Sequence, residues 1–319
     1  MARWLGQRSR RWRTMTALAV FLVLAAGTVA AAAAIHAAAT NSPPASQGGP
    51  ASGNAGAAST GASGQRPGAA DPGSSGSGPA SPGSTSPGST SPGAGGPGAP
   101  QNRPGPVLLV PGYGGDPGEL FRLAARIDAS GRTAIVVSLP GNGTGNLTAD
   151  ARALGAAVSR ALRKGAPSVD VIGYSAGGVA ALIWARDDGG AARARRVITL
   201  GTPFHGTAVA AAAHAFTPSL CSVACRQLVP GSRLLTRLDA APAPPGPRWL
   251  SLWSTDDLVV TPAASARLGG ALNVPIQSVC PGRQINHLQL PTDPVVAAIV
   301  LRAIGITPLR YPTAAACHA

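Results

Sequence analysis

Ser175 lies at the centre of a Gly-x-Ser-x-Gly sequence, residues 173–177, between two apolar runs. The pattern alone is frequent by chance, but a strand before it and a helix after it would give it a structural role. The flanking glycines have no Cβ, so a tight turn can bring strand and helix together and hold the serine at its apex in a strained conformation. The hydroxyl would then face the free amides of the helix N-terminus. This context favours a nucleophilic serine over an idle serine in a glycine-rich turn.

A serine hydroxyl is a weak nucleophile and needs a base within hydrogen-bond reach. The histidines that follow Ser175 are His205, His214, His287 and His318. His318 is next to last in the chain, and His205 and His214 fall in a long irregular stretch. His287 comes after the last predicted strand and before the last predicted helix, where a loop can carry its imidazole over the serine. We therefore predict His287 as the base, with a surface-loop histidine as the alternative. Activity should fall in acid, because only a neutral imidazole accepts a proton.

The carboxylate that orients the base should follow a strand. Asp256 and Asp257 follow the predicted strand 248–254. Only one of them is needed, and we favour Asp257, with Asp256 solvated or capping the turn. Asp293 has another interpretation, because an aspartate at this point can begin the final helix as its cap.

An acyl-transfer intermediate carries an oxyanion that needs preorganised donors. The amide of Ala176, directly after the nucleophile, is the first candidate. The second should come from the glycine-rich loop 111–115 after the first strand, and we predict the Tyr113 amide. The loop has no His-Gly-Gly-Gly run, and its glycines could serve the turn alone.

Apolar strands alternate with amphipathic helices through the second part of the chain. Strands are predicted at 107–110, 133–139, 168–172, 196–200, 248–254 and 273–279, and helices at 118–129, 148–163, 176–186 and 293–304. This order predicts one α/β domain with a mostly parallel central sheet and helices on both faces. Ligands on such sheets bind beyond the carboxyl ends of the strands, where the candidate residues lie.

Residues 1–105 have a different composition. Five arginines precede an uncharged stretch from 14 to 40, which is the order of a secretory signal peptide, although the stretch is long enough to stay as a membrane anchor. Residues 41–105 contain 17 Gly and 12 Pro and nothing more apolar and larger than alanine, which predicts a disordered linker. The expected organisation is therefore a signal peptide or N-terminal membrane anchor (1–40), a linker (41–105) and a catalytic domain (106–319). The positive-inside rule places the last two outside the cytoplasm, secreted or anchored to the outer face of the cytoplasmic membrane.

The net charge of +14 divides into +5 for residues 1–40, +1 for 41–105 and +8 for the remainder. A basic chain invites a nucleic-acid interpretation. The arginines of the third part are scattered, however, and their one cluster, Arg193, Arg195 and Arg196, accompanies no nucleic-acid motif. A solvated face, or attraction to an anionic envelope surface, explains the charge more simply. We expect no nucleic-acid partner.

All four cysteines, Cys221, Cys225, Cys280 and Cys317, lie in the predicted catalytic domain. An even number in an exported chain favours two disulfides, and the sequence does not separate the three pairings. A bridge at Cys280 would stiffen the loop before His287. Zinc is the lesser option, because no histidine stands near Cys221 and Cys225 at a ligand spacing.

These segments together resemble the α/β-hydrolases, and more narrowly the small secreted bacterial triacylglycerol lipases of lipase class 2. The segments that carry the resemblance are 107–115, 139–143, 173–178, 200–207, 254–260 and 286–288. The resemblance implies an α/β-hydrolase fold over nearly all of 106–305, with Ser175 as nucleophile, His287 as base, Asp257 as the orienting acid, and the amides of Tyr113 and Ala176 as the oxyanion hole. At Pro111 the sequence departs from its relatives, which carry histidine before the first loop glycine.

The expected function is that of an exported monomeric lipase or esterase that cleaves lipid or other acyl esters through an acyl-enzyme, in contact with the membrane or cell envelope. The chemistry requires no metal and no organic cofactor. Residues 202–247 could form a lid or acyl-binding wall, or a purely structural cap. The rival interpretations are a thioesterase, polyester hydrolase or acyltransferase with the same triad, and a non-catalytic binding protein of the cell envelope.

Overall fold

Six parallel strands form one sheet in the computed structural model, which describes residues 99–318. Their order across the sheet is β2-β1-β3-β4-β5-β6. The strands are β1 (Val107–Val110), β2 (Ala134–Val136), β3 (Val169–Tyr174), β4 (Ala194–Leu200), β5 (Arg248–Trp253) and β6 (Leu272–Pro275). The predicted parallel α/β architecture is therefore confirmed. The predicted signal or anchor, and residues 41–98 of the predicted linker, lie outside the described residues.

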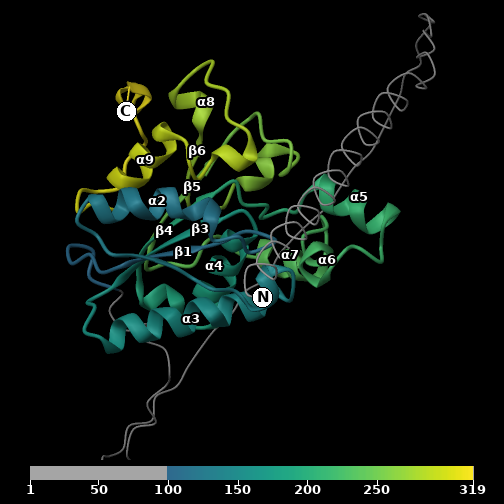
Figure 1. The fold of residues 1–319 in the computed structure, drawn as a ribbon, viewed down its shortest axis with the longest axis horizontal. Helices are drawn as coiled ribbons and strands as arrows, with labels where there is room; N and C mark the ends of the chain where they lie inside the picture. The colour runs from purple at the N-terminus through teal and green to yellow at the C-terminus, as the bar shows by residue number, and fades with distance from the viewer. Residues whose placement is uncertain (1–98, 319) are drawn as a thin grey trace, which may run out of the picture. The chain divides into compact units, whose positions relative to one another are not determined.

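Helices cover both faces of the sheet (Figure 1). Helices α2 (Gly118–Ala129) and α9 (Pro294–Ile304) pack on one face, and α3 (Leu147–Arg163) and α4 (Ala176–Asp187) pack on the other. Strand β1 divides its side chains accordingly, because successive residues of a strand point to opposite faces. Leu108 and Val110 belong to the core beneath α3 and α4, whereas Val107 and Leu109 belong to the core beneath α2 and α9.

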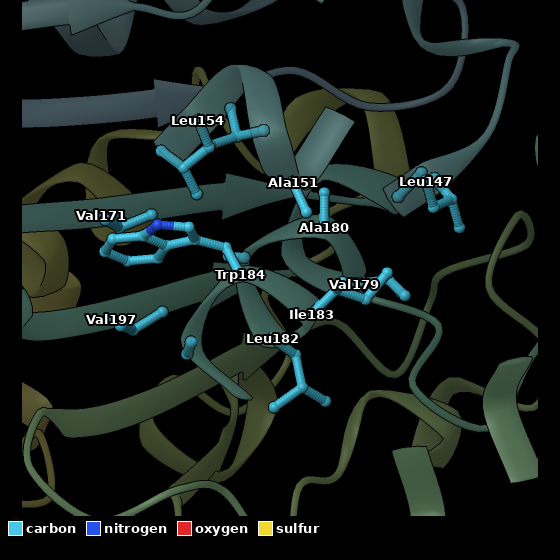
Figure 2. Packing of buried hydrophobic residues seen from close by; sticks show 14 of the residues in the cluster. Leu147, Ala151, Leu154, Val171, Val179, Ala180, Leu182, Ile183, Trp184 and Val197 are labelled. Carbon is cyan, nitrogen blue, oxygen red and sulfur yellow. The ribbon is translucent and has the colours of Figure 1, made fainter. Parts of the chain in front are cut away.

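Trp184 of α4 is the largest fully buried side chain. Its indole lies beside Val171 of β3, with Leu154 of α3 close by (Figure 2). The ring has this space because Gly155 has no side chain, and a Cβ there would lie 3.2 Å from the indole Cδ1. Helix α4 is thus held firmly against the sheet at its far end. This packing fixes the direction in which its N-terminus, next to Ser175, points.

Strand β6 ends earlier than predicted. The predicted strand 273–279 is correct only as far as Pro275, after which residues Ile276–Val279 form the short helix α8. Proline has no amide hydrogen to continue a strand ladder, and its ring restricts the backbone, so the strand stops there. The other edge strand, β2, is shorter than its predicted range 133–139, although the Val137 amide still donates to the Leu109 carbonyl, at 2.8 Å.

The stretch 202–247, expected to be irregular, contains three short helices. They are α5 (Ala208–Phe216), α6 (Val223–Gln227) and α7 (Arg233–Asp239). Each helix begins at a hydroxyl side chain that accepts a hydrogen bond from a backbone amide of the first turn. These capping residues are Thr207 for α5, Ser222 for α6 and Ser232 for α7. Such caps satisfy amides that a short helix would otherwise leave unpaired. Among residues 99–318, no helix has both the length and the apolar character to cross a bilayer.

Two of the three arginines in the cluster, Arg195 and Arg196, belong to the interior, whereas Arg193 is half-buried. Arg195 is fully buried and Arg196 is 3% exposed. Arg195 pairs with the buried carboxylate of Asp170, which also accepts from Arg132 at 2.9 Å. The guanidinium of Arg196 donates to the carbonyl of Ala303 at 2.7 Å. The bond from Arg196, and one from Arg132 to the Ile304 carbonyl at 2.7 Å, tie α9 to the amino ends of the strands, the edge of the sheet opposite Ser175.

Residues 99–105 already contact the sheet. The Gln101 side-chain Nε2 donates to the Arg195 carbonyl at 3.1 Å, and the Ser168 hydroxyl donates to the Arg103 carbonyl at 2.6 Å. Ordered contacts therefore begin before residue 106, where the predicted catalytic domain starts.

Candidate active site

Ser175 occupies the sharp turn between β3 and α4. Its backbone angles, φ 52° and ψ −126°, are strained for a residue with a side chain, as the sequence predicted. The turn depends on two close backbone approaches. A Cβ on Gly173 would lie 2.5 Å from the Cα of Gly178, and one on Gly177 would collide with the carbonyl oxygens of β1 and its following loop. Strand, turn and helix can therefore meet only because both positions are glycine.

His287 approaches the serine from the other end of the chain. Its Nε2 lies 3.0 Å from the Ser175 Oγ. The histidine begins a short 3-10 helix, η4 (His287–Gln289), that is closed by a capping box, in which the Asn286 side chain accepts from the Gln289 amide and the Gln289 side chain accepts from the Asn286 amide. Both bonds fix the conformation of the turn from which the imidazole projects.

Asp257 holds the other imidazole nitrogen. Its Oδ2 lies 2.6 Å from the His287 Nδ1. Its Oδ1 accepts the amides of Val259 and Val260, at 2.9 and 2.8 Å. Asp256, in contrast, is exposed, and the nearest donor to its carboxylate is the Gln277 side chain, at 3.3 Å. Of the two adjacent aspartates, the structure brings Asp257 to the histidine.

The three side chains are withdrawn from water. Ser175 is 9% exposed, His287 4% and Asp257 3%. A carboxylate buried in this way needs partners, and the imidazole and two amides supply them. The lower dielectric around the group also strengthens the attraction between Asp257 and an imidazolium formed at His287. The arrangement can thus take a proton from the serine and stabilise the resulting charge.

The loop 111–115 lies directly against the serine. A Cβ on Gly112 would be 3.0 Å from the Ser175 Cβ. The loop is backed by η1 (Pro140–Gly143), because a Cβ on Gly115 would collide with the backbone of Asn142. Among residues 99–318, neither the Tyr113 amide nor the Ala176 amide has a hydrogen-bond acceptor. Two donors are thus free in the segments that flank the nucleophile, and the predicted oxyanion hole needs both.

Gly201 is a site residue that the sequence did not single out. It follows β4 with φ +53°, and a Cβ there would lie 3.1 Å from the His287 Nδ1 and 3.2 Å from the Asp257 Oδ2. The backbone of Gly201 therefore forms a wall beside the hydrogen bond between acid and base. The only sequence signal was a glycine at the carboxyl end of a predicted strand, which alone is a weak one.

Two further side chains approach His287. The hydroxyl of Tyr174 donates to the His287 carbonyl at 3.2 Å, and the two rings lie 5.2 Å apart between centroids. Glu119, in the first turn of α2, is half-buried. Burial and the neighbouring charge of Asp116 raise the pKa of the Glu119 carboxyl, and His287 acts in the opposite direction. Neither residue was a candidate from the sequence.

In the described part of the chain, residues 99–318, no hydrogen bond joins Ser175 to the other three candidate histidines, His205, His214 and His318. His205 pairs through Nδ1 with Asp239 at 2.9 Å, and its side chain is 50% exposed. His214 is exposed in the last turn of α5, and His318 lies in the short C-terminal 3-10 helix η5 (Ala314–His318). Asp293 accepts the amides of Val295 and Val296 and caps α9, in agreement with its predicted structural role.

The cysteines form two disulfides, as expected from their even number. The pairs are Cys221 with Cys225 and Cys280 with Cys317. The second bridge fastens the C-terminal segment to the start of the loop that leads to His287. Arg283 in that loop also pairs with Asp293 at 2.7 Å. The loop is therefore tied at two points within seven residues of the histidine.

Residues 99–318 contain no group of three or more histidine, cysteine, aspartate or glutamate side chains placed to hold a metal ion.

The sequence profile described as "Alpha/beta hydrolase family" matches residues 107–303, more than half of the 319 residues. The chain belongs to this family. The strand-turn-helix around Ser175 and the six parallel strands are consistent with that membership. No curated protein matches the sequence.

Solved structures with the same fold include lipases. Aspergillus fumigatus lipase B is 20% identical with a TM-score of 0.54, over 66% of this chain and 55% of that one. Bacillus licheniformis lipase BlEst2 in its mature form is 16% identical with a TM-score of 0.52, over 63% of this chain and 92% of that one. The propeptide form of the same lipase is 18% identical with a TM-score of 0.54, over 68% of this chain and 54% of that one. The chain thus spans about half of the first structure, and at these identities the likeness establishes the fold.

Proposed function

We propose that this α/β-hydrolase cleaves carboxylic esters, with Ser175 as nucleophile, His287 as general base and acid, and Asp257 as the orienting carboxylate. One observation carries the proposal: an unbroken series of hydrogen bonds from Oγ through the imidazole to the carboxylate, at 3.0 and 2.6 Å. Both distances lie within the range required for proton transfer and for orientation of the base. The wider family contains many hydrolases, and the narrower assignment to secreted class 2 lipases rests on the resemblance of the motifs.

In the first half of the reaction, Ser175 Oγ attacks the ester carbonyl carbon while its proton passes to His287 Nε2. Asp257 stabilises the imidazolium that forms, and the carbonyl oxygen becomes an oxyanion that the amides of Tyr113 and Ala176 stabilise. When the intermediate collapses, the bond to the alcohol oxygen breaks and the alcohol leaves with the proton from Nε2. An acyl group then remains on Oγ.

Water completes the cycle by the same steps. His287 takes a proton from the water as its oxygen attacks the acyl-enzyme carbonyl, and the second tetrahedral intermediate is held by the same two amides. Its collapse returns the proton to Oγ and releases the carboxylic acid. The strained backbone at Ser175 keeps Oγ at the apex of the turn throughout, so the nucleophile need not be repositioned between the two halves.

Exposed apolar side chains support an acyl substrate. Tyr113 in the loop 111–115 is 45% exposed. Leu258, which follows Asp257, is 70% exposed, and Leu288, which follows His287, is 48% exposed. Helix α5 starts beside the segment that follows Asp257, because its capping residue Thr207 accepts a hydrogen bond from the Thr261 amide at 3.1 Å. Only one of its nine residues is buried. We propose that 202–247 contributes a wall or lid for the acyl chain.

Export is part of the proposal. It rests on the signal-like order of residues 1–40, with two disulfides that suit an oxidising compartment. We propose that the enzyme works as a monomer outside the cytoplasmic membrane, secreted or anchored, on lipid or other acyl esters of its surroundings.

Hydrolysis of p-nitrophenyl esters of increasing chain length, with and without an emulsified triacylglycerol, tests the proposal. Wild-type protein should release p-nitrophenol, and Ser175→Ala should reduce the rate to the background of the reagent. Ser130→Ala, which removes an exposed hydroxyl bonded to its own helix, is the matched control and should keep full activity. Preference for thioesters, polyesters or transfer to an added alcohol would identify another acyl-transfer class. A folded wild-type protein without any turnover would support the binding-protein alternative.

A further inference from the structure

Tyr174 makes contacts to His287 that no step of the proposed mechanism uses. The side chain is 2% exposed, and its ring lies against the imidazole with centroids 5.2 Å apart and planes 31° apart. Its hydroxyl donates to the main-chain carbonyl of His287 at 3.2 Å. The same carbonyl accepts the Leu290 amide at 3.2 Å, so the tyrosine adds a second bond to a group already engaged within the turn.

This contact differs in kind from the others that hold the histidine. The capping box of Asn286 and Gln289 shapes the turn from within and does not set its distance from the serine. Asp257 fixes one imidazole nitrogen and not the backbone behind it. Tyr174, in contrast, is the last residue of β3 and is joined to Ser175 by a single peptide bond. Its side chain therefore links the turn that carries the base to the strand that carries the nucleophile.

The phenol is suited to a constant structural bond. Burial raises the pKa of the Tyr174 hydroxyl, and the negative charges of Glu119 and Asp257 raise it further. The group therefore stays neutral and keeps its proton to donate. The titratable groups near the imidazole are Asp257, which bonds to it, and Glu119, whose carboxyl interacts with it. Neither carboxylate competes for the His287 carbonyl, because a carboxylate accepts and does not donate.

We propose that Tyr174 is a positioning residue that sets the distance between His287 and Ser175. The inference rests on the proposed function, since it assigns Tyr174 a part in the same reaction. Loss of the hydroxyl leaves the triad residues, the oxyanion donors and the substrate surface in place, and frees the histidine turn to shift relative to the nucleophile. Small displacements of this kind reduce the chemical step strongly while binding is retained.

Tyr174→Phe is the test, because it keeps the ring against the imidazole and removes one hydrogen bond. We expect kcat for a p-nitrophenyl ester to fall about 10-fold with KM within twofold of wild type, and the rate of fluorophosphonate labelling to fall by the same factor. Tyr311→Phe is the matched control, since its hydroxyl bonds to Ser278 at the surface, and it should behave as wild type. Active-site titration gives kcat per folded site, so a less stable variant still yields a valid number.

Three results would overturn the inference: kcat of Tyr174→Phe within twofold of wild type, a change confined to KM, or an equal loss in Tyr311→Phe. Fluorophosphonate labelling of the wild-type protein distinguishes failure of the positioning role of Tyr174 from failure of the proposed function. If Ser175 is labelled and Ser175→Ala is inactive while Tyr174→Phe equals wild type, only the positioning role is refuted. If wild-type protein is neither labelled nor active, the proposed function fails, and the positioning role fails with it.

Discussion

Replacement of Asp257 by asparagine should nearly abolish turnover without disturbing the fold. The reason lies in how its two oxygens are used. Oδ1 accepts two backbone amides, from Val259 and Val260, at 2.9 and 2.8 Å, so the asparagine oxygen must take this position. The opposite orientation would set an NH₂ group against two amide donors, of which the Val260 amide is buried and the Val259 amide half-buried, and each buried unsatisfied donor costs about 1 to 3 kcal/mol.

With that orientation fixed, the asparagine NH₂ faces His287 Nδ1, where the Asp257 Oδ2 now lies at 2.6 Å. Nδ1 must then accept, so the imidazole proton moves to Nε2, the atom 3.0 Å from Ser175 Oγ. A protonated Nε2 cannot take the serine proton. A tautomer error of this kind lowers kcat about 10⁴-fold in serine proteases, which corresponds to about 5 kcal/mol in activation free energy.

The assay is kcat per titrated site with a p-nitrophenyl ester near neutral pH, together with thermal unfolding of each variant. Asp256→Asn is the control, because it makes the same chemical change one residue away on an exposed side chain, and its kcat should stay within threefold of wild type. A kcat for Asp257→Asn above about a tenth of wild type, or an equal loss in Asp256→Asn, would show that Asp257 does not set the tautomer of His287.

Two further substitutions test the surroundings of the triad and of the core. Gly201→Ala should lower kcat at least about 100-fold, because its Cβ would lie 3.1 Å from the His287 Nδ1 and 2.6 Å from Leu290, and activity per titrated site measures this. Asp150, 1% exposed with an unpartnered Oδ1, has a pKa raised by burial to about 6, so the folded state binds its proton more tightly than the unfolded chain does. Stability should therefore fall as the pH rises from about 4 to about 6, and Asp150→Asn should raise the free energy of unfolding at pH 8 by at most about 3 kcal/mol, with little change at pH 4.

Both substitutions have controls. Gly231→Ala places a methyl group at a similarly positive φ, +73°, with no atom within 4 Å, so it isolates backbone strain, and its kcat should be that of wild type. Equal losses at Gly201 and Gly231 would contradict the proposed contact with the triad. Asp187→Asn removes an exposed carboxylate paired with Arg237 and should leave the pH dependence of unfolding unchanged. If the free energy of unfolding of Asp150→Asn fell with pH as steeply as that of wild type, the pH dependence would not come from Asp150.

The strand-turn-helix around Ser175 could be predicted because its glycines and apolar runs are local signals. The parallel sheet could be predicted for the same reason, since strands and helices alternate along the chain. The end of β6 at Pro275 was missed, although proline itself gave the signal. Helices α5, α6 and α7 were missed because they are short and lack an apolar periodicity, and only their Thr and Ser caps pointed to them.

The contacts that complete the site depend on distances across the fold. Asp256 and Asp257 are neighbours with the same chemistry, and only the path of the backbone after β5 decides which carboxylate reaches the imidazole. Tyr174 reads in the sequence as a variable position of the Gly-x-Ser-x-Gly pattern, and its bond to His287 joins residues 113 positions apart. Local patterns carry no information about such pairs, so Tyr174 had no sequence signal as a site residue and Gly201 had only a weak one.

Mass-spectrometric mapping of a fluorophosphonate adduct on the folded wild-type protein would show whether Ser175 is an activated nucleophile. An activated serine hydroxyl reacts with this reagent, whereas an ordinary one does not. We expect one adduct, on Ser175, which disappears on unfolding and forms much more slowly in Asp257→Asn. No adduct on Ser175 in folded protein, or labelling that is equally fast in Asp257→Asn, would contradict this expectation.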